Sequence, residues 1–225
     1  MQVASRGNRT GETRRAARLY LLAPQVIEPT DVATALSEGL AAADIAAVLL
    51  HLAGADDSTL VRRAQAIAPL VQKRGAALLL DAHPDIVARC GADGAHLAGI
   101  DQFRAAFAAL KPDRIAGCGG LKTRHDAMLA GEAGADYVMF GEPDAAQRRP
   151  SFAAILDRIA WWAELFEVPC VGYAANVEEV APLAAAGADF VALGEWVFAQ
   201  SAGQGGPAAT IVGAARCLAD VEVAA

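Results

Sequence analysis

The sequence predicts a single-domain (β/α)8 barrel of the TIM type, and three observations support this prediction. A Gly-Ala-Asp triplet followed by an apolar run occurs at 91–93, 134–136 and 187–189, with a weaker Ala-Asp copy at 43–44. Further apolar runs fall midway between these copies, and helix-like segments separate them. Eight such βα units in 225 residues suit a barrel, whose usual length is about 250 residues.

The eight expected strands are apolar throughout rather than alternating, which is typical of parallel strands that are buried on both faces. In chain order they cover 19–23, 45–52, 76–81, 94–97, 114–118, 137–141, 169–173 and 190–193. An open, doubly wound sheet would also explain the alternation of strands and helices. It would not explain eight units of nearly equal length.

The helix boundaries follow from capping residues and helix breakers. The expected helices cover 30–42, 58–73, a short stretch from 84, 101–111, 124–133, 151–166, 177–186 and 207–220. Thr30 or Asp31, Ser58 and Asp101 are expected N-caps, because their side chains accept hydrogen bonds from the free N–H groups of a first turn. Gly75 is expected to end the second helix.

The Gly-Ala-Asp copies are expected to stabilise the barrel rather than to take part in chemistry. Glycine after a helix supplies the left-handed cap residue. An aspartate just before a strand lies at the N-terminal face of a barrel, whereas chemistry in this fold occurs at the C-terminal face. The copies therefore mark strands whose other ends face the pocket.

The first 17 residues differ in composition from the rest of the chain. They contain four arginines, one acid and no strand pattern, so we expect a disordered N-terminal arm at 1–17 and a barrel domain at 18–225. A targeting peptide is the alternative, although the segment lacks an apolar core and contains Glu12.

Bulk composition excludes several classes of partner. The net charge of −7 argues against a nucleic acid or an anionic membrane surface. No apolar run approaches the roughly 20 residues that span a bilayer. The four cysteines lack CxxC spacing, which indicates free thiols and a reducing, cytoplasmic compartment. Apolar helix faces, with Trp161 and Trp162 as candidates, make a homodimer possible.

Polar residues near the C-terminal ends of the strands are the candidate site residues. They are His51, Asp81, His83, His96, Asp101, Lys122, Arg124, Glu142, Arg148, Arg149, Tyr173, Asn176, Gly194, Glu195 and Trp196. Asp81 and Asp101 come from adjacent strand ends, so their carboxylates can converge on Mg2+, which takes one or two protein carboxylates. The alternative for Asp101 is a helix cap. The three strand-end histidines are an alternative Zn2+ set without ligand spacing.

The segment LLLDAHPDIVARCGADGAHLAGID at 78–101 resembles a region of the thiamine phosphate synthase family. Shorter matching pieces are GEAGADYVMFG at 131–141, VPCVG at 168–172 and AAAGADFVAL at 184–193. The resemblance runs from 19 to about 199. It implies a barrel that joins hydroxymethylpyrimidine diphosphate to thiazole phosphate, with Asp81 and Asp101 as Mg2+ ligands and a small phosphorylated heterocycle as partner. Thiazole tautomerases share the fold.

Several positions depart from that family's pattern. The cationic stretch after the second strand is Val-Leu-Leu-His-Leu-Ala here, which leaves His51 as its only polar residue. Gly119 and Gly194 stand where the family has serines, and Ala174-Ala175 replace two glycines. The family's lysine in the loop after the sixth strand is replaced by Arg148 or Arg149.

The tautomerase histidine also has no counterpart in register: Leu121 or Lys122 takes its place, with His125 nearby. Glu195 places a negative charge where a phosphate would lie, and two like unit charges about 4 Å apart repel by about 4 kcal/mol near a protein surface.

Three functional hypotheses follow. The first is a divergent, Mg2+-dependent thiamine phosphate synthase. The second is a non-catalytic ligand-binding or regulatory paralogue that has lost the diphosphate site. The third is an enzyme acting on an uncharged or cationic ligand, with Glu142, Glu195 and the histidines as acid–base groups. A positive barrel mouth favours the first hypothesis, and a negative one favours the third.

Overall fold

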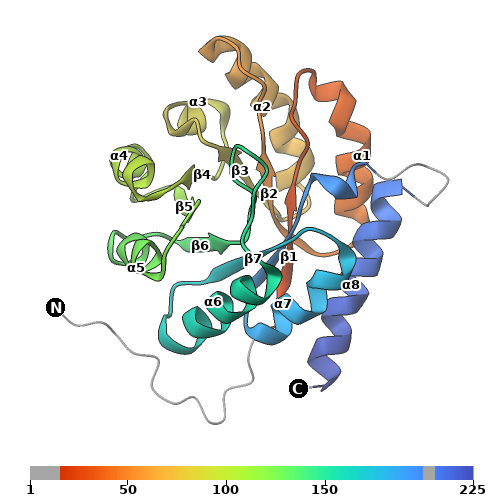
Figure 1. The fold of residues 1–225 in the computed structure, drawn as a ribbon. Helices are drawn as coiled ribbons and strands as arrows, with labels where there is room; N and C mark the ends of the chain where they lie inside the picture. The colour runs from red at the N-terminus through yellow and green to blue at the C-terminus, as the bar shows by residue number, and fades with distance from the viewer. Residues whose placement is uncertain (1–15, 200–205, 225) are drawn as a thin grey trace.

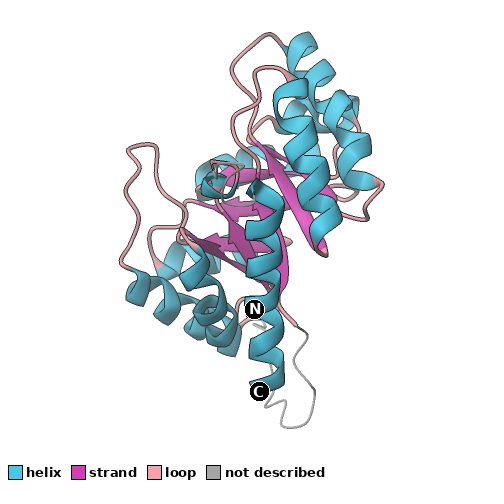
Figure 2. Cartoon of the chain, turned by 90° about the vertical axis from the view of Figure 1, so that its right-hand side faces the viewer, coloured by secondary structure: helices cyan, strands magenta, loops and turns pink. Residues whose placement is uncertain are grey.

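The computed structural model describes residues 16–199 and 206–224. Within them, eight parallel strands close into a barrel in sequence order, and helices surround it (Figures 1 and 2). The predicted single-domain (β/α)8 barrel is therefore confirmed, and the open doubly wound sheet is excluded. Most of the expected N-terminal arm lies outside the described residues.

The elements lie close to their predicted places. The strands are β1 (Arg18–Leu22), β2 (Ile45–Leu50), β3 (Ala77–Asp81), β4 (Gly94–Ala98), β5 (Ile115–Gly119), β6 (Tyr137–Phe140), β7 (Cys170–Ala174) and β8 (Phe190–Leu193). The α-helices are α1 (Pro29–Ala42), α2 (Asp57–Gln72), α3 (Val87–Cys90), α4 (Ile100–Leu110), α5 (Arg124–Glu132), α6 (Phe152–Leu165), α7 (Val180–Ala186) and α8 (Gly206–Ala224). Short 3-10 turns are η1 (Pro84–Ile86), η2 (Val177–Glu179) and η3 (Glu195–Val197).

Three expected helix caps were wrong. Helix α1 begins at Pro29, whose fixed φ suits the first helical position, so neither Thr30 nor Asp31 is its N-cap. Asp56 caps α2 instead of Ser58, because its Oδ1 accepts a hydrogen bond from the Thr59 N–H at 3.1 Å. Asp101 lies inside the first turn of α4, after the N-cap Gly99. Its carboxylate therefore does not cap the helix.

The aspartates of the Gly-Ala-Asp copies join neighbouring strands at the bottom of the barrel. The side chains of Asp93, Asp136 and Asp189 accept hydrogen bonds from the backbone N–H groups of Leu78, Ala116 and Cys170 at 2.7, 2.7 and 2.9 Å. Each aspartate also donates its own N–H to the carbonyl of the same partner, at 2.8, 2.9 and 2.9 Å. These paired bonds hold β3 to β4, β5 to β6 and β7 to β8 in register.

The aspartate of the weaker Ala-Asp copy at 43–44 makes a different contact. Asp44 forms an exposed ion pair with the guanidinium of Arg18 at 2.9 Å, rather than accepting a backbone hydrogen bond. The register between β1 and β2 shifts between Leu19 and Tyr20.

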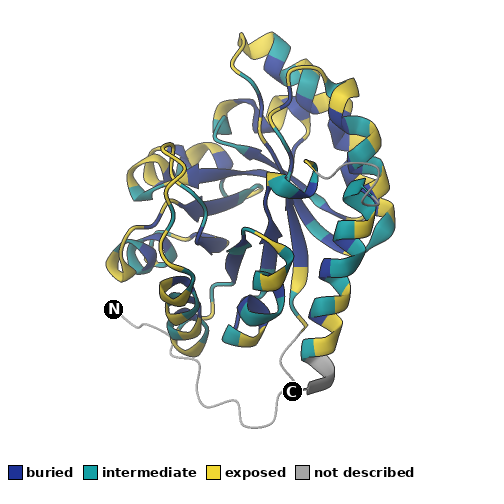
Figure 3. Cartoon of the chain, turned by 45° about the vertical axis from the view of Figure 1, so that its right-hand side comes forward, coloured by how far each residue is buried: buried dark blue, intermediate teal, exposed yellow. Residues whose placement is uncertain are grey.

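Two apolar layers fill the molecule, one between strands and helices and one inside the barrel. Figure 3 shows that the strands are mostly buried, whereas the helices also carry exposed residues. The inner layer includes Leu49, Leu79, Met139 and Val171. Helix α8 packs beside α1 and α7 and completes the outer ring (Figure 1). No helix among the described residues is long and apolar enough to cross a membrane.

Both tryptophans proposed for a dimer interface make contacts within the chain. Trp162 is buried, and its indole N–H donates to the Val168 carbonyl at 2.7 Å. Trp161 packs edge-on against Phe166, with the Arg124 guanidinium 4.9 Å from its ring centroid. The homodimer stays a prediction.

Replacing Asp93 by alanine should lower the free energy of unfolding by about 1–3 kcal/mol, because it removes the carboxylate that accepts the N–H of the buried Leu78. Asp44→Ala is the matched control, and loss of its exposed ion pair should cost about 0–1 kcal/mol. Urea denaturation of both variants measures the difference. Equal losses would contradict a special role for the backbone-pairing aspartates.

Candidate functional site

The mouth of the barrel, formed by the C-terminal strand ends and the loops after them, is acidic on the side of β2, β3 and β8. The His51 Nε2 lies 3.5 Å from an Asp81 carboxylate oxygen, and its Nδ1 lies 3.6 Å from a Glu195 carboxylate oxygen. One imidazole thus stands between two carboxylates. Residues 48–53, where the family resemblance implies a basic stretch, contain no lysine or arginine, and the Arg63 guanidinium of α2 donates to the Ala53 carbonyl at 2.9 Å.

A chain of polar groups runs from this acidic side into the barrel. Asp81 pairs in register with His96 of β4, whose ring is buried. The His96 Nδ1 is 2.9 Å from the hydroxyl of Tyr137, and that hydroxyl is 3.0 Å from the hydroxyl of Tyr20. Burial lowers the pKa of His96 to about 4, against the weaker opposing effect of Asp81. The imidazole is therefore neutral at physiological pH.

Glu142, directly after β6, lies next to His96 at the end of this chain. Its carboxylate accepts a hydrogen bond from the Gly120 N–H. A Cβ atom at Gly119 would overlap both the Glu142 carboxylate and the His96 ring, so only glycine fits there. Burial raises the pKa of Glu142 to about 6, while the Gly120 N–H and Arg158 act in the opposite direction. Glu142 can therefore exchange a proton near neutral pH.

A pocket of about 400 Å3 opens between the loops that follow β5 and β6. Four cationic and two acidic side chains line it: Lys122, Arg148, Arg149, Arg158, Glu142 and Asp144. Arg158 donates to the carbonyls of Leu121 and Lys122 at 2.7 and 3.1 Å, which fixes its guanidinium at the pocket wall. This side of the mouth carries a positive excess.

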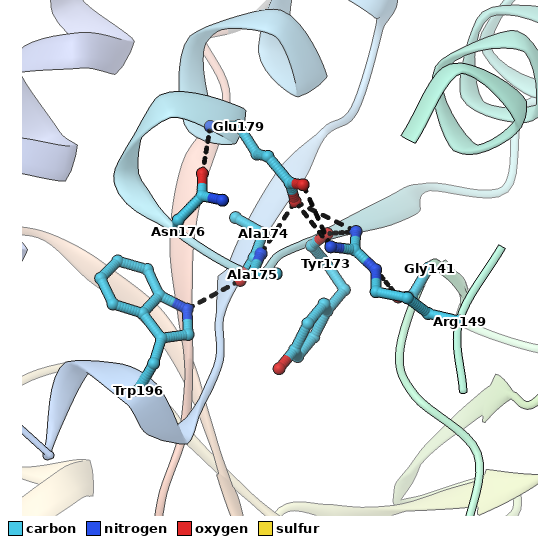
Figure 4. Close-up of polar contacts among 8 residues, drawn as sticks. All are labelled: Gly141, Arg149, Tyr173, Ala174, Ala175, Asn176, Glu179 and Trp196. Atoms are coloured by element: carbon cyan, nitrogen blue, oxygen red, sulfur yellow. Dashed lines mark hydrogen bonds and ion pairs between the residues drawn. The ribbon is translucent and has the colours of Figure 1, made fainter. Parts of the chain in front are cut away.

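The two arginines that were candidates to replace the family's lysine are both engaged in ion pairs. Arg148 is exposed and pairs with Asp144 at 2.8 Å. Arg149 is largely buried and pairs with Glu179 at the start of the α7 segment at 3.0 Å (Figure 4). Glu179 also accepts the Ala175 N–H at 2.9 Å.

Tyr173 occupies the space left by the missing side chain at Gly194. A Cβ atom at Gly194 would overlap the Tyr173 hydroxyl. The ring of Tyr173 also lies 5.5 Å from the Arg149 guanidinium carbon. Burial raises the pKa of Tyr173, the Arg149 charge lowers it, and Glu195, Glu179 and Glu142 raise it further. Its phenol is therefore neutral and available as a hydrogen-bond donor.

The remaining candidates are dispersed around the mouth. His83 has a left-handed backbone at φ 53° and lies directly before η1. Lys122 is exposed at the pocket rim. Among residues 16–199 and 206–224, no group of three or more His, Cys, Asp or Glu side chains is placed to bind a metal, so the three-histidine Zn2+ site is not supported.

Sequence reasoning missed Glu179, Arg158, Tyr20 and Tyr137. The only sequence signal for Glu179 was an acidic residue in the first turn after β7.

Glu142→Gln tests the raised pKa of the buried carboxyl. The folded-state pKa of about 6 lies above the usual 4.5, so ionisation of Glu142 destabilises the fold as the pH rises through this interval. That difference corresponds to about 2 kcal/mol. The unfolding free energy of Glu142→Gln relative to the unmodified protein should therefore rise by about this amount between pH 4 and pH 7.5.

Urea denaturation across this pH range measures the change, with the exposed Glu178→Gln as control. A stability difference that does not vary with pH would show that Glu142 ionises as freely as an exposed carboxyl.

Comparison with known proteins agrees with the geometry of the fold. The family described as "Thiamine monophosphate synthase" matches residues 19–197. Thiamine-phosphate synthase of Rhodospirillum centenum is 40% identical over 197 residues, covering 86% of this chain and 94% of that protein. Its counterpart in Hyphomonas neptunium is 34% identical over 210 residues, covering 90% of this chain and 94% of that protein.

Solved structures support the same fold at lower sequence identity. Thiamine phosphate pyrophosphorylase from Pyrococcus furiosus superposes with a TM-score of 0.76 at 17% identity, covering 91% of this chain and 96% of that chain. A 3-hexulose-6-phosphate synthase from Salmonella typhimurium gives 0.67 at 16% identity, covering 90% and 99% of the two chains. The match over nearly the whole barrel and the identity to full-length relatives together place this chain in the thiamine monophosphate synthase/TENI family.

Proposed function

We propose that the protein is a divergent thiamine-phosphate synthase of thiamine biosynthesis. In the proposed reaction, the bond between the pyrimidine methylene carbon and its diphosphate breaks, and the ring nitrogen of a thiazole forms a bond to that carbon. Diphosphate leaves with the electron pair of the broken bond. The observation that carries the proposal is one barrel mouth holding both the Asp81 carboxylate and a pocket with a positive excess.

The carboxylates near β3 and β4 fit a magnesium ion by their chemistry. Asp81 ends β3 with its side chain partly exposed, and Asp101 is exposed in the first turn of α4 without a capping role. Two hard oxygen donors suffice for Mg2+, which keeps waters and substrate phosphates as its other ligands. Asp81 and Asp101 would hold the ion, which when bound neutralises charge on the diphosphate.

The pocket residues support the same reaction through their charge. Lys122 and Arg158 supply cations at the pocket between the loops after β5 and β6. A leaving diphosphate gains negative charge as its bond to carbon breaks, and fixed cations stabilise that charge. Glu142 lines this pocket, and its carboxyl would form a hydrogen bond with a proton-bearing group of the heterocycle.

A non-catalytic ligand-binding paralogue is the second candidate. The acidic surroundings of His51 favour it, because a diphosphate cradle after β2 needs cations. Turnover decides between the two functions.

Purified protein with hydroxymethylpyrimidine diphosphate, a thiazole substrate and Mg2+ should form the coupled product. Asp81→Asn and Asp101→Asn should each lower kcat/KM by about 100-fold, because each removes an anionic ligand from the ion. Asp113→Asn, exposed in the turn before β5, is the matched control and should retain activity.

Absence of product from the unmodified protein, together with no thermal shift on adding diphosphate, would contradict the proposed enzyme. Diphosphate binding without turnover would support the paralogue instead.

A further inference from the structure

The Glu142 carboxylate lies where the pocket between the loops after β5 and β6 meets the interior of the barrel. Glu142 lines this pocket. A Cβ atom at Gly119 would meet both a Glu142 carboxylate oxygen and the Nε2 of the buried His96. The carboxylate therefore stands between an open pocket and a buried imidazole, where a ligand in the mouth can reach it.

This carboxylate has hydrogen-bonding capacity that the chain leaves unused. Two backbone N–H groups, of Gly120 and of Glu142 itself, are directed at it. Within residues 16–199 and 206–224, no side chain forms a hydrogen bond or an ion pair with it. Arg158 lines the same pocket but donates to the carbonyls of Leu121 and Lys122 instead. A carboxylate accepts about four hydrogen bonds, so a ligand with N–H groups can supply the missing donors.

The position of Glu142 is fixed before any ligand binds. Gly141, directly before it, has a φ of 96°, in the region that favours glycine, and a Cβ atom there would press against Ile155. The Gly141 carbonyl accepts a hydrogen bond from the Arg149 Nε at 3.1 Å, and Arg149 is itself held by its ion pair with Glu179 (Figure 4). Glu142 thus presents a preorganised charge, which needs no reorganisation during a reaction.

The substrate of the proposed reaction brings a matching group to Glu142. In that reaction the pocket binds the diphosphate, and a single methylene joins the diphosphate to the pyrimidine ring. The ring therefore lies within reach of a residue that lines the pocket. The ring also carries an amino group on the carbon next to the one that bears the methylene. This amino group has two N–H donors, and Glu142 has the free acceptor.

We propose that Glu142 is a catalytic residue that accepts a hydrogen bond from the amino group of the pyrimidine and stabilises the positive charge that develops on the ring. This inference rests on the proposed function and names the residue that recognises the pyrimidine. The alternative is a structural role, in which Glu142 only accepts the Gly120 N–H and holds the loop after β5.

The charge of Glu142 suits the transition state better than the ground state. When the bond to the diphosphate breaks, the electron pair leaves with the diphosphate, and the positive charge on the methylene carbon is shared with the amino nitrogen. A carboxylate beside the amino group attracts that cation more strongly than the neutral ring, which lowers the barrier. Burial raises the pKa of Glu142 to about 6, so the carboxylate is mostly ionised at pH 7.5. The thiazole nitrogen supplies the electron pair of the new bond, and no proton has to move.

Binding without turnover tests the recognition of the amino group. Calorimetry compares hydroxymethylpyrimidine diphosphate with an analogue that lacks the amino group, both without thiazole. The unmodified protein should bind the amino compound about 10–100-fold more tightly, because the hydrogen bond is made to a charged group. Glu142→Ala should bind the two compounds within about threefold of each other. Glu142→Leu, which fills the same space, gives the same comparison if the alanine variant fails to fold.

Turnover tests the stabilisation of the developing charge. Glu142→Gln keeps an acceptor for the Gly120 N–H but has no charge, so kcat should fall by about 100-fold while KM changes by less than about threefold. The exposed Glu178→Gln is the matched control and should retain its kcat. A purely structural role would not separate kcat from KM in this way.

Three results would overturn the inference. They are equal affinity of the unmodified protein for the two diphosphates, an undiminished preference for the amino compound in Glu142→Ala, and a kcat of Glu142→Gln within about threefold of the unmodified value. If the unmodified protein forms no product, the proposed enzyme fails, while calorimetry still decides whether Glu142 recognises the pyrimidine.

Discussion

The paired hydrogen bonds at the bottom of the barrel are the constraint on which the mouth depends. Asp93, Asp136 and Asp189 each bind the backbone of the preceding strand through both a carboxylate and an N–H. A one-residue slip in a strand would turn every side chain to the opposite face. These paired bonds therefore keep Asp81 in register with His96, and they hold β6 so that Glu142 lies beside His96.

At two positions of the mouth, the hydroxyl groups that the family pattern implies are replaced by other polar groups rather than simply lost. The two positions where the resemblance implies serines are glycines, and each vacated volume is taken by a neighbour. Glu142 and His96 occupy the space beside Gly119, and the Tyr173 hydroxyl occupies the space beside Gly194. Hydroxyls have thus been replaced by a carboxyl with a pKa near neutrality and by a phenol.

The fold could be predicted from sequence because its signals are local. Apolar runs, helix-ending glycines and strand-opening aspartates each occupy a few consecutive residues, and their repetition gave the number and order of strands. The N-caps of α1, α2 and α4 were harder to predict. Helix α1 begins at Pro29 and α2 is capped by Asp56, although good capping residues follow one or two positions later. The strand-end rule located the mouth and most of its polar residues.

The partners of those residues could not be predicted in the same way. The contact between Arg149 and Glu179 joins residues 30 positions apart across two loops. Nothing in the sequence of either loop specifies it. Tyr20 and Tyr137 were expected only as strand residues, because their hydroxyl contact spans 117 positions and exists only once the barrel closes.

The cost of burying a charged group explains why Arg149 and Glu179 form an ion pair. A guanidinium cannot give up its charge and is costly to bury without an anion. In a phosphate-binding barrel the ligand supplies that anion, and the cation can remain open to solvent before binding. Here the Arg149 side chain is only 21% exposed, and an anion of the chain itself lies against it. Glu179 meets this requirement and also accepts the Ala175 N–H, so one carboxylate satisfies both the buried cation of the loop after β6 and the backbone of the loop after β7.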